Sequence, residues 1–150
     1  MNARGERPGR LSRKVSWRGR VPGAQENSED RDIALMRAIV NGDDDAVRDL
    51  LAEGADANVK DKGGLTALMW AAGSGRLNIV RLLLAAGANV NAESAMGRTA
   101  LMFAAQAGHT AVVMGMLVAG ADAGARDESG LTALQIAERH GRAEVVKLLK

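Results

Sequence analysis

A spacing of 33 residues constrains this sequence more than any other feature. Glycine recurs at that interval, at Gly42, Gly75, Gly108 and Gly141. Further columns keep the same step, namely threonine at 66, 99 and 132, alanine at 67, 100 and 133, leucine at 35, 68, 101 and 134, and the pair Gly-Ala from 54, 87 and 120. A repeat of this length is one supersecondary unit that buries its apolar face by stacking on its neighbours. The sequence therefore predicts a stacked solenoid.

Each unit is expected to contain two helices separated by glycine turns. In the unit from 61 to 93, Gly64 supplies turn geometry, and Thr66 can cap the free N–H groups of a helix through residues 68–72. Residues 73–75 end that helix, and Gly87 fits a left-handed C-cap after the second one. The second helix carries apolar residues at helical spacing, Ile79, Val80, Leu82, Leu83 and Leu84. The 28 alanines of the chain allow the paired helices to approach closely.

The order of these motifs within one unit resembles the ankyrin repeat. The segments that follow the family pattern are Gly64-Leu65-Thr66-Ala67-Leu68, Ala71-Ala72, Gly75, Ile79-Val80, Leu82-Leu83-Leu84 and Gly87-Ala88-Asn89-Val90-Asn91. The resemblance covers residues 32–150 as four copies, about 32–60, 61–93, 94–126 and 127–150. It implies an all-α fold, an ankyrin-repeat solenoid of helix-turn-helix units with β-hairpin-like loops. The first and last copies lack parts of the pattern, as terminal caps do.

Two positions depart from the family pattern. The usual proline after the threonine is alanine in three copies, so the first helices start without the residue that fixes their first turn. The usual histidine of the same motif is Met69, Met102 and Gln135. This departure implies altered hydrogen bonding between neighbouring loops and a more apolar seam. Met36, Met69 and Met102 form a column at the same 33-residue step. We predict that these methionines lie partly in the core and partly on a contact surface, and that Trp70 and Phe103 pack between repeats.

The charge of the chain is concentrated near its N-terminus. Residues 1–20 carry seven Lys or Arg against the single acid Glu6, whereas residues 32–150 carry twelve basic and fourteen acidic side chains. Both prolines also lie in the first thirty residues, which show no helical or strand periodicity. We therefore predict a disordered basic arm over residues 1–31. The arm is open to four interpretations: a spacer, a misassigned start, an organellar transit peptide or a nucleic-acid-binding segment. No secretory signal is recognised, and a cytoplasmic location is expected.

The composition leaves few residues for chemistry. The chain has no Cys, no Tyr and two His, which excludes disulfides, zinc ribbons and thiol nucleophiles. The segment Gly73-Ser74-Gly75-Arg76 is interpreted as a turn because it lacks the ending of a phosphate-binding loop. His109 is assigned a structural role, and residues 43–45 are expected to begin a helix. We expect no catalytic residues, no cofactor, no metal and no membrane insertion, and hence no enzyme.

The resemblance implies that a partner protein binds the concave face formed by the loop tips and first helices. The residues expected to contact it are Lys62, Leu65, Met69, Ser74, Met96, Arg98, Met102, Gln106, Glu128, Leu131, Arg139 and His140. Leu65, Met96 and Leu131 are placed at loop tips, where the fold requires no apolar residue. The expected function is that of a monomeric, non-catalytic interaction module, either a scaffold or a regulatory or inhibitory subunit. The alternative is an adaptor that binds nucleic acid or another anionic surface through the basic arm.

Overall fold

The computed structural model describes residues 28–150, and residues 1–27 of the arm predicted over residues 1–31 lie outside this range. The described residues form eight helices and no strand. The helices are α1 (Ser28–Asn41), α2 (Asp44–Ala52), α3 (Ala67–Gly73), α4 (Leu77–Ala85), α5 (Ala100–Ala107), α6 (Thr110–Val118), α7 (Ala133–Arg139) and α8 (Ala143–Leu149). The all-α class predicted from the repeat is confirmed.

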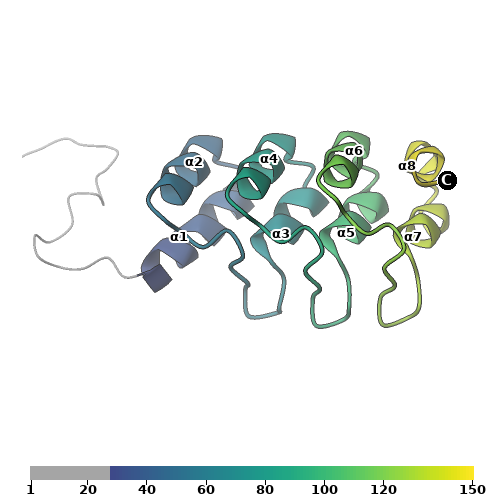
Figure 1. Cartoon of the computed structure of the whole chain (residues 1–150), viewed down its shortest axis with the longest axis horizontal. Helices are drawn as coiled ribbons and strands as arrows, with labels where there is room; N and C mark the ends of the chain where they lie inside the picture. The colour runs from purple at the N-terminus through teal and green to yellow at the C-terminus, as the bar shows by residue number, and fades with distance from the viewer. Residues whose placement is uncertain (1–27) are drawn as a thin grey trace, which may run out of the picture.

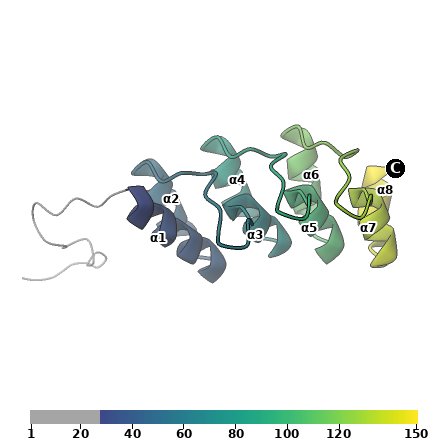
Figure 2. The same ribbon diagram turned by 90° about the horizontal axis from the view of Figure 1, so that it is seen from below.

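The helices form two parallel rows, with one helix of each pair in each row (Figure 1). The first helices α1, α3, α5 and α7 make the lower row, and α2, α4, α6 and α8 make the upper row. Each first helix packs on its own partner and on the first helix of the next pair, which continues the stack along its length (Figure 2). The predicted solenoid of four helix-turn-helix units is therefore confirmed.

Three long loops join the pairs and extend beyond the first-helix row (Figure 1). We call them the finger loops; they span residues 53–66, 86–99 and 119–132. Their tips close like hairpins, because Asp61 N donates to Leu65 O at 2.9 Å and Ser94 N donates to Arg98 O at 2.8 Å. A single antiparallel bridge joins residues 60 and 66. The β-hairpin-like character expected of these loops is confirmed.

Threonine starts three of the first helices without help from proline. Thr66 Oγ1 accepts from Met69 N at 3.1 Å, and Thr66 N donates in return to Met69 Sδ at 3.3 Å. Thr99 and Met102 repeat this arrangement. In the fourth unit, Gln135 Oε1 replaces the sulfur and accepts from the threonine N–H at 2.9 Å. These reciprocal pairs are capping boxes, which satisfy orphan N–H groups at the helix start.

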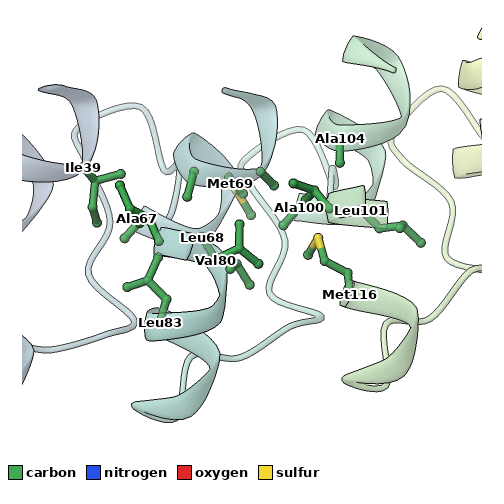
Figure 3. Packing of buried hydrophobic residues seen from close by; sticks show 14 of the residues in the cluster. Ile39, Ala67, Leu68, Met69, Val80, Leu83, Ala100, Leu101, Ala104 and Met116 are labelled. Carbon is green, nitrogen blue, oxygen red and sulfur yellow. The ribbon is translucent and has the colours of Figure 1, made fainter. Parts of the chain in front are cut away.

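The core is a continuous strip between the two rows. Small residues such as Ala71 and Ala104 have no exposed surface and let first helices approach each other, while Leu83 and Met116 reach down from the second row. Figure 3 shows Leu83 and Met116 pointing from the second helices toward the first helices, where Leu68 and Leu101 lie. Because every pair shares its buried surface with its neighbours, no pair has a core of its own.

Basic residues that begin the second helices cover the turn of the preceding unit. His109 Nε2 lies 3.1 Å from the carbonyl oxygen of Gly73, and Arg142 Nε donates to Gln106 O at 2.8 Å. Gly75 has φ of +72°, and a Cβ there would stand 2.7 Å from the ring of His109. The turn glycine is therefore required by both backbone geometry and space. The structural role predicted for His109 is confirmed.

The folded body begins earlier than predicted. Helix α1 starts at Ser28, so residues 28–31 belong to the first unit and not to an arm. The guanidinium of Arg31 donates to Glu53 O at the end of α2, and Asp32 Oδ1 accepts from Asp56 N at 2.8 Å. The first turn of α1 is polar and acidic, which suits a helix N-terminus but carries no apolar periodicity. This explains why the sequence pattern placed the boundary too late.

Candidate functional site

One face of the solenoid, which we call the groove face, lies between the finger loops and the first helices. Three open hollows lie along it. The α1 hollow, of about 600 Å³, is bounded by α1 and residues 59–62. The central hollow, of about 230 Å³, lies over α3 and α5, and the α7 hollow, of about 300 Å³, lies between two finger loops and α7. Together they make one side of the molecule hollowed along its length.

The α7 hollow gathers half of the contact residues predicted from the sequence. These are Met96, Arg98, Glu128, Leu131, Arg139 and His140. Met96 is 60% exposed, which agrees with its predicted place at a loop tip. Arg98 Nε lies 3.7 Å from Asp127 Oδ2, and its guanidinium carbon lies 5.3 Å from the ring centroid of Phe103. The Arg98 cation is therefore held by a carboxylate and an aromatic ring.

The remaining predicted residues divide among other places. Leu65 and Ser74 line the central hollow, and Lys62 lines the α1 hollow. Gln106 lines none of the three hollows; it lies in the last turn of α5, where its carbonyl accepts from Arg142. Leu65 is half-buried against the core, as is Leu131, so of the three loop-tip residues only Met96 is strongly exposed.

Two methionines of the column lie in the core, which agrees with the core part of the prediction and not with the contact-surface part, whereas Met36 is half-buried and lines the α1 hollow. Met69 and Met102 are 2% and 1% exposed. Each occupies the third position of its helix, where the side chain turns inward and its sulfur accepts the threonine N–H. A flexible thioether fills this site well, because it supplies apolar volume and a weak acceptor together. Neither residue can therefore contribute appreciable area to a partner.

The aromatic pair shows the opposite error. Trp70 was expected between repeats, but it is 36% exposed and lines the central hollow with the half-buried Phe103. Trp70 follows the inward-facing Met69 by one residue, and a step of about 100° along the helix turns its ring toward the groove face. Its Nε1–H donates to Asp61 Oδ2 at 2.8 Å. The indole therefore presents an apolar face to the groove while its polar atom is satisfied.

Asp61 fixes the tip of the first finger loop. Its Oδ1 accepts from Gly63 N and Leu65 N, each at 2.9 Å. Burial raises the pKa of this carboxyl, but the hydrogen bonds from Leu65, Trp70 and Gly63 outweigh burial, and the pKa lies below its ordinary value. Asp61 is therefore a positioning residue that joins the loop to the groove aromatic.

The α1 hollow contains two residues, Ile33 and Val40, that sequence reasoning missed. Ile33, Met36 and Val40 stand on one side of α1, opposite the buried Leu35 and Ile39. Their spacing of three and four residues was the available signal, because it marks a second apolar stripe on a helix that already has one.

The groove face has the side-chain composition of a recognition surface. Within residues 28–150, no three His, Asp or Glu side chains are grouped so that they could hold a metal ion. None of the helices over these residues has the length and apolar character that crossing a membrane requires. The side chains of the groove are apolar, aromatic and charged in turn, a composition found at protein interfaces.

Comparison with known proteins gives one family. A family model described as ankyrin repeats (3 copies) matches residues 35–127 and residues 91–150. No curated protein sequence matches the chain. Ankyrin repeats generally act as modules that bind other proteins, and they are typically non-catalytic. Since the match spans the helix pairs, the finger loops and the groove described above, the chain belongs to the ankyrin repeat family.

Proposed function

We propose that this chain is a non-catalytic module that binds a partner protein along the groove face, as a scaffold or as a regulatory subunit. The observation that carries the proposal is a line of exposed apolar residues that the stack does not need for its own core. Ile33, Trp70 and Met96 stand in three successive hollows on the same face. Exposed apolar side chains gathered on one face are typical of interaction sites.

Rigid loops support this proposal, since a preorganised surface loses little entropy when a partner binds. Asn58 Oδ1 accepts from Asn89 N at 2.6 Å, and its Nδ2 donates to Gly87 O at 3.3 Å. Asn91 makes the same pair of bonds to the following unit, with Asp122 N and Gly120 O. Each finger loop is thereby tied to the next at its base.

The groups that could take part in chemistry have structural partners, which supports a non-catalytic role. His109 faces the carbonyl of Gly73, and His140 Nδ1 lies 3.0 Å from the carbonyl of Ile136. A general base needs a free nitrogen or oxygen aimed at substrate. One ring nitrogen of each histidine is therefore engaged by a backbone carbonyl.

Affinity capture from the source lysate with the full chain tests the proposal. The groove variant carries Ile33→Glu and Met96→Glu, and the matched control carries Met114→Glu and Val118→Glu on α6. All four side chains are exposed apolar residues, so both variants should keep the parent's circular dichroism and thermal melt. We expect a protein retained by the parent and the control to be lost by the groove variant. Equal retention by both variants would place the binding site elsewhere.

A second candidate function follows from the charge of residues 1–20, which carry seven Lys or Arg and one acid. Such a segment supplies sequence-independent phosphate contacts whose strength falls steeply with salt. Nuclease treatment of the lysate separates the two functions. Retention that disappears with nuclease or moderate salt, and is unaffected by the groove variant, would favour nucleic-acid binding.

A further inference from the structure

The α1 hollow combines a stripe of aliphatic residues from one helix with three cations that have no partner among residues 28–150. We propose that it binds an acidic peptide segment of a partner protein, with aliphatic side chains of that segment seated on α1 and its carboxylates facing the rim. This inference rests on the proposed function, because the hollow is one end of the same groove face. It adds the chemistry of the partner.

The floor of the hollow is aliphatic. Ile33 and Val40 are 53% and 51% exposed, and Met36 and Val59 are half-buried beside them. Three of these residues come from α1 at spacings of three and four, so they form one stripe about two turns long. A stripe of this kind fits side chains of a peptide that recur at a similar spacing.

The same positions are closed in the next two units. The residues 33 and 66 positions after Ile33 and Met36 are Thr66 and Met69, then Thr99 and Met102, and all four are buried. In those units the capping box covers the start of the first helix, as described above. The first unit has isoleucine where the others have threonine, which leaves an apolar surface where the later units have a satisfied polar one.

The rim of the hollow is cationic. Arg37, Lys60 and Lys62 line it, and their side chains have no hydrogen-bond or ion-pair partner among residues 28–150. The lining of the α7 hollow balances two cations, Arg98 and Arg139, with two acids, Asp127 and Glu128, and Arg98 is held by Asp127. Charges without a partner in the protein remain available to a ligand, and they steer association as well as strengthening it.

The two carboxylates of the lining are already engaged. Asp32 accepts from Asp56 N at 2.8 Å. Asp61 accepts from Leu65 N at 2.9 Å and from Trp70 Nε1 at 2.8 Å. Both acids are therefore oriented by groups of the protein itself, and the cations of the rim are not neutralised by direct contact with them.

The cations of the rim and the aliphatic floor together indicate which ligand fits the α1 hollow. The basic segment of this chain over residues 1–20 would meet like charge at the rim. A single-stranded nucleic acid would suit the cations, but the floor has no aromatic ring on which bases could stack. A peptide with aliphatic anchors between carboxylates satisfies both the floor and the rim.

Fluorescence anisotropy of the full chain with synthetic peptides tests this assignment. The probe carries leucine at i, i+3 and i+7 and glutamate at most other positions. One matched peptide replaces every glutamate with lysine, and another replaces every leucine with serine. We expect the glutamate–leucine peptide to bind about tenfold or more tightly than either, and to weaken as salt is added.

Two variants of the full chain locate the binding. Lys60→Glu with Lys62→Glu should weaken the glutamate–leucine peptide about tenfold or more, since attraction becomes repulsion. Arg48→Glu with Arg81→Glu changes net charge equally on exposed residues of α2 and α4, away from the hollow, and should leave affinity unchanged. All four side chains are exposed, and a thermal melt verifies that both variants fold.

The possible failures are distinguishable. Preference for the lysine peptide, equal binding of all peptides, no binding, or equal loss in both variants would each overturn the acidic-peptide assignment. The groove function is tested separately by the lysate capture. A partner lost by the Ile33→Glu, Met96→Glu variant and retained by Lys60→Glu, Lys62→Glu would sustain the proposed function while refuting this inference.

Discussion

At the residue scale, one side-chain oxygen organises the tip of each finger loop. Asp61, Ser94 and Asp127 are 33 residues apart, and each accepts N–H groups two and four residues further on. Aspartate binds these donors with a full charge, whereas the Ser94 hydroxyl does so without one. The first and third loops therefore hold their tips partly by electrostatics. In the first loop the lowered pKa of Asp61 makes this contribution depend on pH.

Replacing Asp61 with asparagine should remove part of that dependence. The folded-state pKa of Asp61 lies below its ordinary value of 3.8, so its stabilising contribution is present above that value and lost as pH falls through the folded pKa. We expect Asp61→Asn to lower the free energy of unfolding near neutral pH and to converge toward the parent in acid. Urea unfolding across this range measures both. Trp70→Phe removes one hydrogen-bond donor to Asp61 and should partly flatten the dependence of unfolding free energy on pH. Parallel profiles for the parent and Asp61→Asn would contradict a stabilising role of the Asp61 charge.

At the element scale, the second helices present different outer faces. The column Arg48, Arg81, Met114 and Lys147 is charged in three units and apolar in the third. Helix α6 has no charged residue, and Val118 near its end is 90% exposed. Periodicity alone would assign such a helix to a fully buried place, but its position in the outer row leaves one side uncovered.

Replacing Met114 or Met116 of α6 with arginine should affect stability very differently, although the two residues are only two positions apart. Met114→Arg restores the residue type of the column on an exposed surface, and we expect a change in unfolding free energy within about 0.5 kcal/mol. Met116 has no exposed surface, so Met116→Arg would bury an unpaired charge and should abolish the cooperative melt. Circular dichroism melts of both variants give the comparison. Similar melts for the two would show that the register of α6 is wrong.

The elements also show which features a sequence can predict. The starts of α3, α5 and α7 follow from threonine caps, and the turns follow from glycines at fixed spacing, because these signals are local. The start of α1 was missed since a polar first turn is stabilised by distant contacts such as Arg31 with Glu53. The direction in which the Trp70 ring points depends on the neighbouring finger loop, where Asp61 accepts a hydrogen bond from the indole N–H.

The candidate site was only partly predictable for the same reason. The α7 hollow brought together six residues chosen as loop-tip or concave positions, because the repeat places equivalent residues on one face. The α1 hollow requires knowing that Ile33 and Val40 remain uncovered, and exposure is a property of the assembled stack. Burial of Met69 is likewise a property of the folded unit, in which its sulfur accepts from the N–H of Thr66.

At the scale of the whole molecule, neighbouring units stabilise one another through shared buried surfaces and through the hydrogen bonds of Asn58 and Asn91. Such solenoids behave as one-dimensional chains, in which the strength of each interface decides whether the units unfold together. Asn91 joins the second and third finger loops, with its Oδ1 2.7 Å from Asp122 N and its Nδ2 3.2 Å from Gly120 O. Its removal should therefore affect cooperativity as well as stability.

Asn91→Ala should leave the N–H of Asp122 and the carbonyl of Gly120 without their protein partner. These groups are exposed at the loop base, so water replaces part of the loss, and we expect a decrease of about 1 kcal/mol in unfolding free energy. Because the weakened contact joins neighbouring units, the urea transition should also broaden, with a smaller dependence on denaturant. Asn78→Ala, which removes a single 3.3 Å contact with Asp44 on the outer row, serves as the control and should do neither. An Asn91→Ala transition as steep as that of the parent would mean that the helix rows alone couple the units.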